Sequence, residues 1–128
     1  MAQILVVDDE IGIRELLSEI LEDEGHHIWL AENATAARRL RAEKRPDLVL
    51  LDVMMPGSLD GYQVCQKIRQ EPGLCNIPVI LLTARGQQAD FEMGRQAGAD
   101  AYLTKPFSPL ELIDTVDSQL ARTVGAHA

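Results

Sequence analysis

The sequence has no long hydrophobic run, no excess of basic residues and no basic, apolar leader. No apolar stretch approaches the roughly 20 residues of a membrane-spanning helix, and residues 1–10 lack the pattern of a signal peptide. The net charge of -8 argues against direct binding to nucleic acid or to an anionic membrane, because both require a cationic face. A cytoplasmic location is therefore the default expectation.

Cysteine and histidine are also scarce. Cys65 and Cys75 could pair in principle, but two cysteines in an otherwise cytosolic-looking chain are more typical of reduced packing residues. None of the three histidines is spaced with a cysteine like a zinc ligand pair, so no zinc site is predicted. The 128 residues are enough for one domain with a buried core, and a second domain would not fit.

What the sequence does contain is a set of short apolar runs that stop at polar residues. These are Ile4 to Val7 before Asp8 and Asp9, Leu48 to Leu51 before Asp52, Val79 to Leu82 before Thr83, and Ala101 to Leu103 leading through Thr104 to Lys105. Such runs are typical of parallel strands that helices cover on both faces. Ligands bind beyond the carboxyl ends of these strands, where the three carboxylates, the hydroxyl and the ammonium would converge. The pattern predicts a site for a divalent cation and a phosphoryl group.

Helical patterns separate the apolar runs. Gly25 ends the first helix, and His27 to Ala31 gives another strand. Asn33 can cap a second helix, which Pro46 prevents from continuing.

The last helix has the clearest start, because Ser108 and Glu111 form a capping box with Pro109 at the first helical position. Five strands alternating with five helices predict an α/β fold, a three-layer, doubly wound five-stranded parallel sheet with right-handed crossovers. The predicted domain covers residues 1–121, and residues 122–128 are expected to form a flexible tail.

Several motifs together resemble the receiver domain of bacterial two-component response regulators, over Ile4 to about Leu120. They are Asp8 with Asp9, Asp52 with Met55 and Pro56, Thr83 with Ala84, and Lys105 with Pro106 and Phe107. The resemblance implies a flavodoxin-like fold with the sheet order 2-1-3-4-5.

It also implies roles for the polar residues at the strand ends. Asp52 would attack the phosphorus of a phosphohistidine and become an aspartyl phosphate. Asp9 and Asp52 would bind Mg²⁺ (or Mn²⁺) directly, Asp8 mainly through water, and the backbone carbonyl of Met54 would be a third protein ligand. Lys105 would pair with Asp52 at rest and with the phosphoryl oxygens after transfer.

A switch and its partners follow from the same resemblance. Thr83 would donate its hydroxyl to a phosphoryl oxygen, Tyr102 would turn inward, and the bond between Lys105 and Pro106 would be cis. The expected partners are a sensor histidine kinase or phosphotransfer protein, and an effector domain or protein that contacts the fourth helix, fifth strand and fifth helix. The chain would act as a switch that assists its own phosphorylation and dephosphorylation, not as an enzyme, and as a monomer or weak dimer.

One stretch departs from the family pattern. Residues 57–59, between Pro56 and Asp60, make this loop one residue longer than usual, so we expect it to bulge with Ser58 outward and Leu59 in the apolar slot.

Two other functions compete with the switch. A receiver-like module that never takes phosphate is one, but the intact set of acids, threonine and lysine speaks against it. The other is a phosphohydrolase with an aspartyl nucleophile, such as the haloacid dehalogenases. These place a second aspartate two residues after the first, which Asp8, Asp9 and Glu10 do not match.

Overall fold

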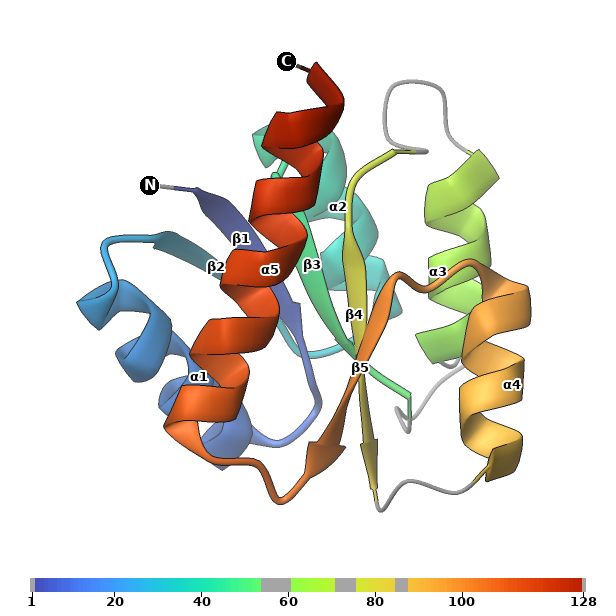
Figure 1. The fold of residues 1–128 in the computed structure, drawn as a ribbon, viewed down its shortest axis with the longest axis horizontal. Coiled ribbons are helices and arrows are strands. Elements are labelled where there is room, and N and C mark those ends of the chain that lie inside the picture. The colour runs from blue at the N-terminus through green and yellow to red at the C-terminus, as the bar shows by residue number, and fades with distance from the viewer. Residues whose placement is uncertain (1, 54–60, 71–75, 85–87, 128) are drawn as a thin grey trace.

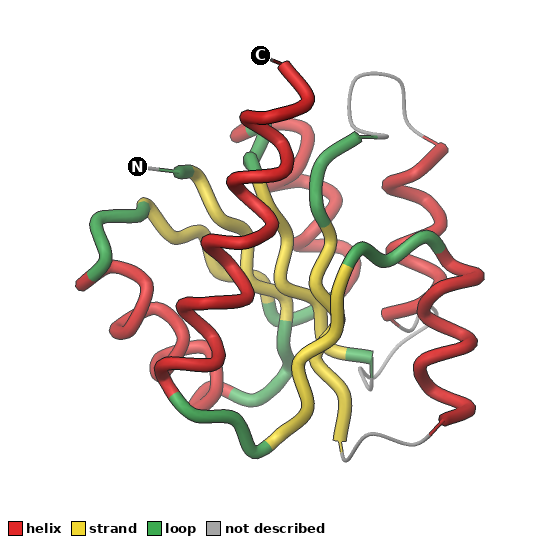
Figure 2. Tube along the Cα trace, viewed as in Figure 1, coloured by secondary structure: helices red, strands yellow, loops and turns green. Residues whose placement is uncertain are grey.

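The computed structural model describes residues 2–53, 61–70, 76–84 and 88–127 (Figures 1 and 2). Its strands are β1 (Gln3–Val7), β2 (His27–Ala31), β3 (Leu48–Asp52), β4 (Val79–Ala84) and β5 (Ala101–Lys105). Its helices are α1 (Ile11–Asp23), α2 (Ala34–Lys44), α3 (Gly61–Gln70), α4 (Gln88–Ala97) and α5 (Pro109–His127). All neighbouring strands are parallel and follow the order β2-β1-β3-β4-β5, which confirms the predicted fold.

Two hydrophobic cores lie on opposite faces of this sheet. One joins alternate strand residues to Leu17 and Leu21 of α1 and to Leu112 and Val116 of α5. The other lies beneath the helices α2, α3 and α4, which cover the opposite face in Figure 1. The continuous apolar runs are thus explained, because β1, β3 and β4 are buried on both faces.

The residues predicted to begin and end the helices do so in the structure. Gly25 adopts φ +89°, a left-handed conformation that favours glycine. The side chain of Asn33 accepts a hydrogen bond from the backbone N–H of Ala36 at 2.9 Å. Ser108 Oγ accepts from the N–H of Glu111 at 3.1 Å, and Glu111 Oε1 accepts from the N–H of Ser108 at 3.2 Å, which is the capping box.

The end of α5 differs from expectation, because the helix continues to His127 and so includes residues 122–127, where we expected a flexible tail. This segment contains no proline, and once the capping box has started the helix each further residue adds a backbone hydrogen bond.

Several predicted features lie outside the described residues: the carbonyl of Met54, the lengthened loop at 57–59, and Cys75. Cys65 is a buried free thiol on α3, and burial raises the pKa of this thiol to about 11, against the opposing charge of Arg69. In the part of the chain that the structure describes, no helix combines the length and hydrophobicity needed to cross a bilayer.

Candidate functional site

The polar residues predicted to converge lie at the carboxyl ends of the central strands. In Figure 1 the arrowheads of β4 and β5 point to the lower edge of the molecule, where these ends lie. Asp8, Asp52 and Lys105 each stand two residues after a member of the core beneath α1 and α5. Because successive side chains of a strand alternate between faces, all three point to that same face.

Three carboxylates form the acidic part of the site. Asp8, Asp9 and Asp52 each offer one oxygen, and these oxygens lie within 4.8 Å of one another. Asp8 is completely buried and Asp52 is 4% exposed, whereas Asp9 is open to solvent. Carboxylate oxygens at this spacing fit a hard divalent cation such as Mg²⁺, with the exposed side left for water ligands.

Lys105 supplies the positive charge, but its closest partner is not the one we expected. Its Nζ lies 2.9 Å from Oδ2 of Asp8 and 3.5 Å from Oδ1 of Asp52. Burial, the largest single effect, lowers the pKa of Lys105. The hydrogen bond to Asp8 and the charges of Asp52, Asp8 and Glu10 outweigh it, so the pKa is raised above 10.5. At rest Lys105 is therefore a charged bridge between two carboxylates, held mainly by Asp8.

Arg14, in the first turns of α1, also contacts the site, although it was not among the predicted site residues. Its Nη1 donates to the backbone carbonyl of Asp8 at 2.7 Å, while Oδ1 of Asp8 accepts from the N–H of Glu10 at 2.9 Å. The sequence signal for this contact was the position of the arginine, in the first turns of the helix that follows Asp8 and Asp9.

Thr83 and Tyr102 lie on the other face of the sheet. In the register of β4 and β5, Leu81 pairs with Tyr102 and Thr83 with Thr104, so all four side chains share the face that α3 and α4 cover. Thr83 is 1% exposed, and its hydroxyl has no hydrogen-bond partner among the described residues. A buried hydroxyl in this state costs about 1 to 3 kcal/mol.

The peptide bond between Lys105 and Pro106 is cis, the isomer that the resemblance implies.

Gly61 is a second residue that lies against the site but was not among the predicted site residues. It begins α3, and its N–H donates to the carbonyl of Val53 at 3.1 Å. A Cβ atom at this position would lie 2.7 Å from Cα of Val53 and closer still to the carbonyl oxygen of Asp52. Only glycine allows α3 to approach the backbone of Asp52 this closely.

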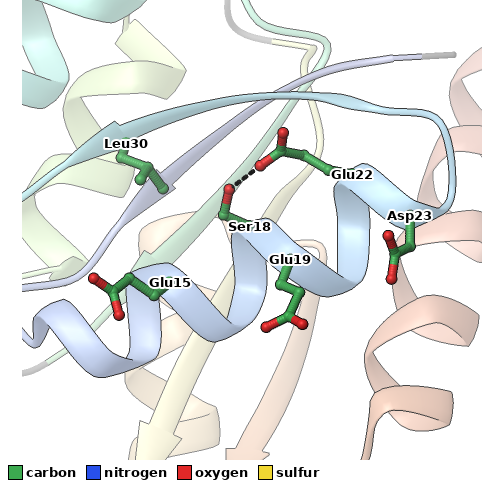
Figure 3. A pocket seen from close by; sticks show the side chains of 6 residues that line it. All are labelled: Glu15, Ser18, Glu19, Glu22, Asp23 and Leu30. Carbon is green, nitrogen blue, oxygen red and sulfur yellow. Dashed lines mark hydrogen bonds between the residues drawn. The ribbon is translucent and has the colours of Figure 1, made fainter.

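A separate open hollow lies between α1 and the edge strand β2 (Figure 3). Its lining is almost entirely acidic or hydroxylic, and Ser18 donates a hydrogen bond to Glu22 within it. The lining residues are Glu15, Ser18, Glu19, Glu22, Asp23 and Leu30. Since none of them is cationic, this hollow offers nothing that would neutralise a phosphoryl group.

Comparison with known proteins points to one family. A family model described as the response regulator receiver domain matches residues 4–117. Response regulator Rre1 of Synechocystis sp. is 47% identical over 120 residues, which cover 93% of this chain and 52% of that protein. The phosphate regulon transcriptional regulatory protein PhoB of Pseudomonas aeruginosa is 41% identical over 120 residues, covering 94% of this chain and 52% of that protein. The chain thus spans about half the length of the curated relatives it matches.

Solved structures agree with the sequence matches. The chemotaxis response regulator CheY4 of Vibrio cholerae superposes with a TM-score of 0.87 at 30% identity, covering 92% of this chain and 98% of that one. The receiver domain of NtrX from Brucella abortus gives a TM-score of 0.86 at 34% identity, covering 92% and 98%. With the family model matching most of its length, the chain belongs to the response regulator receiver domain family of two-component signalling proteins.

Proposed function

We propose that Asp52 accepts a phosphoryl group from the phosphohistidine of a sensor histidine kinase or phosphotransfer protein. The observation that carries this proposal is the position of Lys105, whose Nζ lies 3.5 Å from Asp52 and 2.9 Å from Asp8 beside a third carboxylate. In the transfer, the bond between phosphorus and the histidine nitrogen breaks and a bond to a carboxylate oxygen of Asp52 forms. The product is an acyl phosphate, and the histidine nitrogen keeps the electron pair.

The residues around Asp52 would act by positioning and by neutralising charge, which phosphoryl transfer requires most. Asp9 and Asp52 would hold Mg²⁺, Asp8 would act mainly through water, and Met54 would add its carbonyl. The ion supplies positive charge to the phosphoryl oxygens when it is bound. Lys105 would shift from its bridge with Asp8 toward those oxygens.

The buried hydroxyl of Thr83 supports a role in relaying the change. A phosphoryl oxygen on Asp52 would give this hydroxyl the acceptor that the described residues do not supply. Its movement toward that oxygen would free space on the α3 and α4 face, where half-buried Tyr102 lies and could turn inward. Phosphorylation would thus shift the population of conformations on α4, β5 and α5.

We propose that this output surface contacts an effector domain or a separate effector protein. Met93 on α4 and Leu110 on α5 are 50% and 67% exposed, so an effector would find apolar side chains there. We expect a monomer or weak dimer.

The test is phosphorylation by a small donor. The chain is incubated with Mg²⁺ and acetyl phosphate, and intact mass is measured for the parent, Asp52→Asn and Asp114→Asn, an exposed carboxylate on α5. We expect the parent and Asp114→Asn to gain the mass of one phosphoryl group and Asp52→Asn to gain none. A parent that gains no mass would indicate a passive interaction module, and many donor turnovers per minute would indicate a phosphohydrolase.

A further inference from the structure

Each polar group of Asp8 has a hydrogen-bond partner. Its N–H donates to the carbonyl of Ala31 at 3.1 Å, and its two carboxylate oxygens accept from the N–H of Glu10 and from Lys105 Nζ, both at 2.9 Å. The remaining polar group, the backbone carbonyl, accepts from Nη1 of Arg14 at 2.7 Å. Arg14 is the only one of these partners that binds the peptide group joining Asp8 to Asp9.

The Asp9 carboxylate has fewer contacts than the carboxylates of Asp8 and Asp52, so its position depends more on this peptide group. This carboxylate is exposed, and within the described ranges no hydrogen bond from another side chain or from the backbone fixes it. A peptide unit is planar, so holding the Asp8 carbonyl also fixes the orientation of the Asp9 N–H and limits the positions of the Asp9 side chain. The bond from Arg14 therefore constrains the backbone from which the Asp9 side chain extends.

We propose that Arg14 is a positioning residue for divalent cation binding, acting through the peptide group between Asp8 and Asp9. This inference rests on the proposed function, since it takes Mg²⁺ to be the ion that the three carboxylates hold. Arg14 would not touch the ion. It would keep the exposed carboxylate within reach of the two buried ones.

Charge and geometry predict opposite effects when Arg14 is replaced. Arg14 places a positive charge close to the carboxylates, so charge alone predicts that Arg14→Gln binds Mg²⁺ more tightly than the parent. Loss of positioning predicts weaker binding, because residues that orient metal ligands commonly change metal affinity by roughly tenfold or more. Arg14→Lys keeps the charge but loses the long planar guanidinium.

The experiment is a titration of Mg²⁺ onto the metal-free chain by isothermal titration calorimetry. We expect the dissociation constant to rise from the parent to Arg14→Lys and to rise further, roughly tenfold over the parent, in Arg14→Gln. Arg39→Gln, which removes the same charge from an exposed position on α2, should bind like the parent. Arg14→Gln binding as tightly as the parent or more tightly, or Arg39→Gln weakened equally, would overturn the proposal.

Two checks keep the result decisive. If Arg14→Gln does not fold, as judged by circular dichroism, Arg14→Lys decides alone, because its charge is unchanged and parental affinity would then overturn the proposal. The parent is also tested with acetyl phosphate. If it neither binds Mg²⁺ nor gains a phosphoryl group, the proposed function fails and this inference fails with it. If the parent does both and Arg14→Gln is not weakened, only this inference fails.

Discussion

At the scale of single residues, Lys105 shows how the site is stabilised before any ion or phosphoryl group arrives. Its ammonium lies between Asp8, which is completely buried, and Asp52, which is almost so. Without this charge two buried carboxylates would face each other and the exposed Asp9. The raised pKa of Lys105 reports that the folded state stabilises its charged form.

This gives a prediction for pH. The folded-state pKa lies above the ordinary value of 10.5, so the contribution of Lys105 to stability is fully present below that value and is lost as the pH rises through the folded-state pKa. Lys105→Met should lower the free energy of unfolding by about 2 kcal/mol near neutral pH, because a charge-assisted hydrogen bond is lost. Urea unfolding should show that the difference in the free energy of unfolding between Lys105→Met and the parent shrinks above pH 10.5. A difference that grows above this pH would contradict the assignment.

Gly61 gives a second prediction at this scale. A methyl group there would collide with the backbone of Asp52 and Val53, so Gly61→Ala should destabilise the protein by about 1 to 3 kcal/mol. The same variant should take a phosphoryl group from acetyl phosphate more slowly, since Asp52 is displaced. Gly12→Ala is the matched control. It lies inside α1 with no atom within 4 Å of the added carbon, and should gain up to about 1 kcal/mol.

At the scale of elements, α1 carries acidic side chains that repel one another on its outer surface. Glu15, Glu19 and Asp23 follow one another at intervals of four residues along the hollow of Figure 3. Like charges at this spacing lie on one side of a helix and destabilise it. The buried face, with Leu17 and Leu21, offsets this cost.

Glu19→Lys should therefore stabilise the protein by about 0.8 to 2 kcal/mol, because two repulsive pairs become attractive. Glu19→Gln should give about half of this gain, since it only removes the repulsion. Thermal or urea unfolding at low salt would measure both. At about 1 M NaCl, where charges are screened within roughly 3 Å, a gain that persisted undiminished would show that charge is not its cause.

Another contact between elements ties α3 to the start of β5. The guanidinium of Arg69 donates to the carbonyls of Gly98 at 2.8 Å and Ile77 at 2.6 Å and forms an ion pair with Asp100. Asp100 also accepts from the N–H of Val79 at 2.9 Å. This cluster lies at the amino ends of β4 and β5, away from the acidic site.

Arg69→Met should lower the free energy of unfolding by about 2 to 3 kcal/mol, because two carbonyls lose this donor and the Asp100 carboxylate loses its positively charged partner. Arg69→Lys should recover little, since an ammonium cannot reach all three acceptors as the planar guanidinium does. Arg95→Met removes an exposed ion pair with Glu92 and should cost less than about 1 kcal/mol. Equal losses for Arg69→Met and Arg95→Met in urea unfolding would argue against the cluster.

The same scale shows what the sequence could and could not predict. The strands could be predicted because each buried run ends at a polar residue, and their order followed from the family resemblance. The end of α5 could not, because no proline marks it. The acidic cluster followed from its place at the strand ends. The closer pairing of Lys105 with Asp8 could not be predicted, because it depends on a small difference between two distances. The bond from Arg14 could not be predicted either, because its acceptor is a backbone carbonyl, which every residue has.

At the scale of the whole molecule, ion binding should couple to unfolding. If the folded chain holds Mg²⁺ and the unfolded chain does not, Mg²⁺ at about ten times its dissociation constant should add about 1.4 kcal/mol. The midpoint of thermal unfolding should rise by about 5 °C for a domain of this size. Differential scanning calorimetry at constant ionic strength would measure it. Asp9→Asn should lose most of the rise and Asp114→Asn should keep it, and a rise that survived in Asp9→Asn would place the ion elsewhere.

The alternation of side chains across the sheet has a consequence for how such a protein can diversify. Asp8, Asp52 and Lys105 project from one face, and Thr83 and Tyr102 project from the other. Exposed side chains of α4 such as Met93 can therefore change without displacing the carboxylates, because a layer of backbone separates them, whereas Gly61 of α3 lies against the backbone of Asp52 and cannot. A lineage that acquires a new partner on the exposed surface of α4 can thus keep its phosphoryl-accepting chemistry, as long as Gly61 and Thr83 on that side of the sheet are kept.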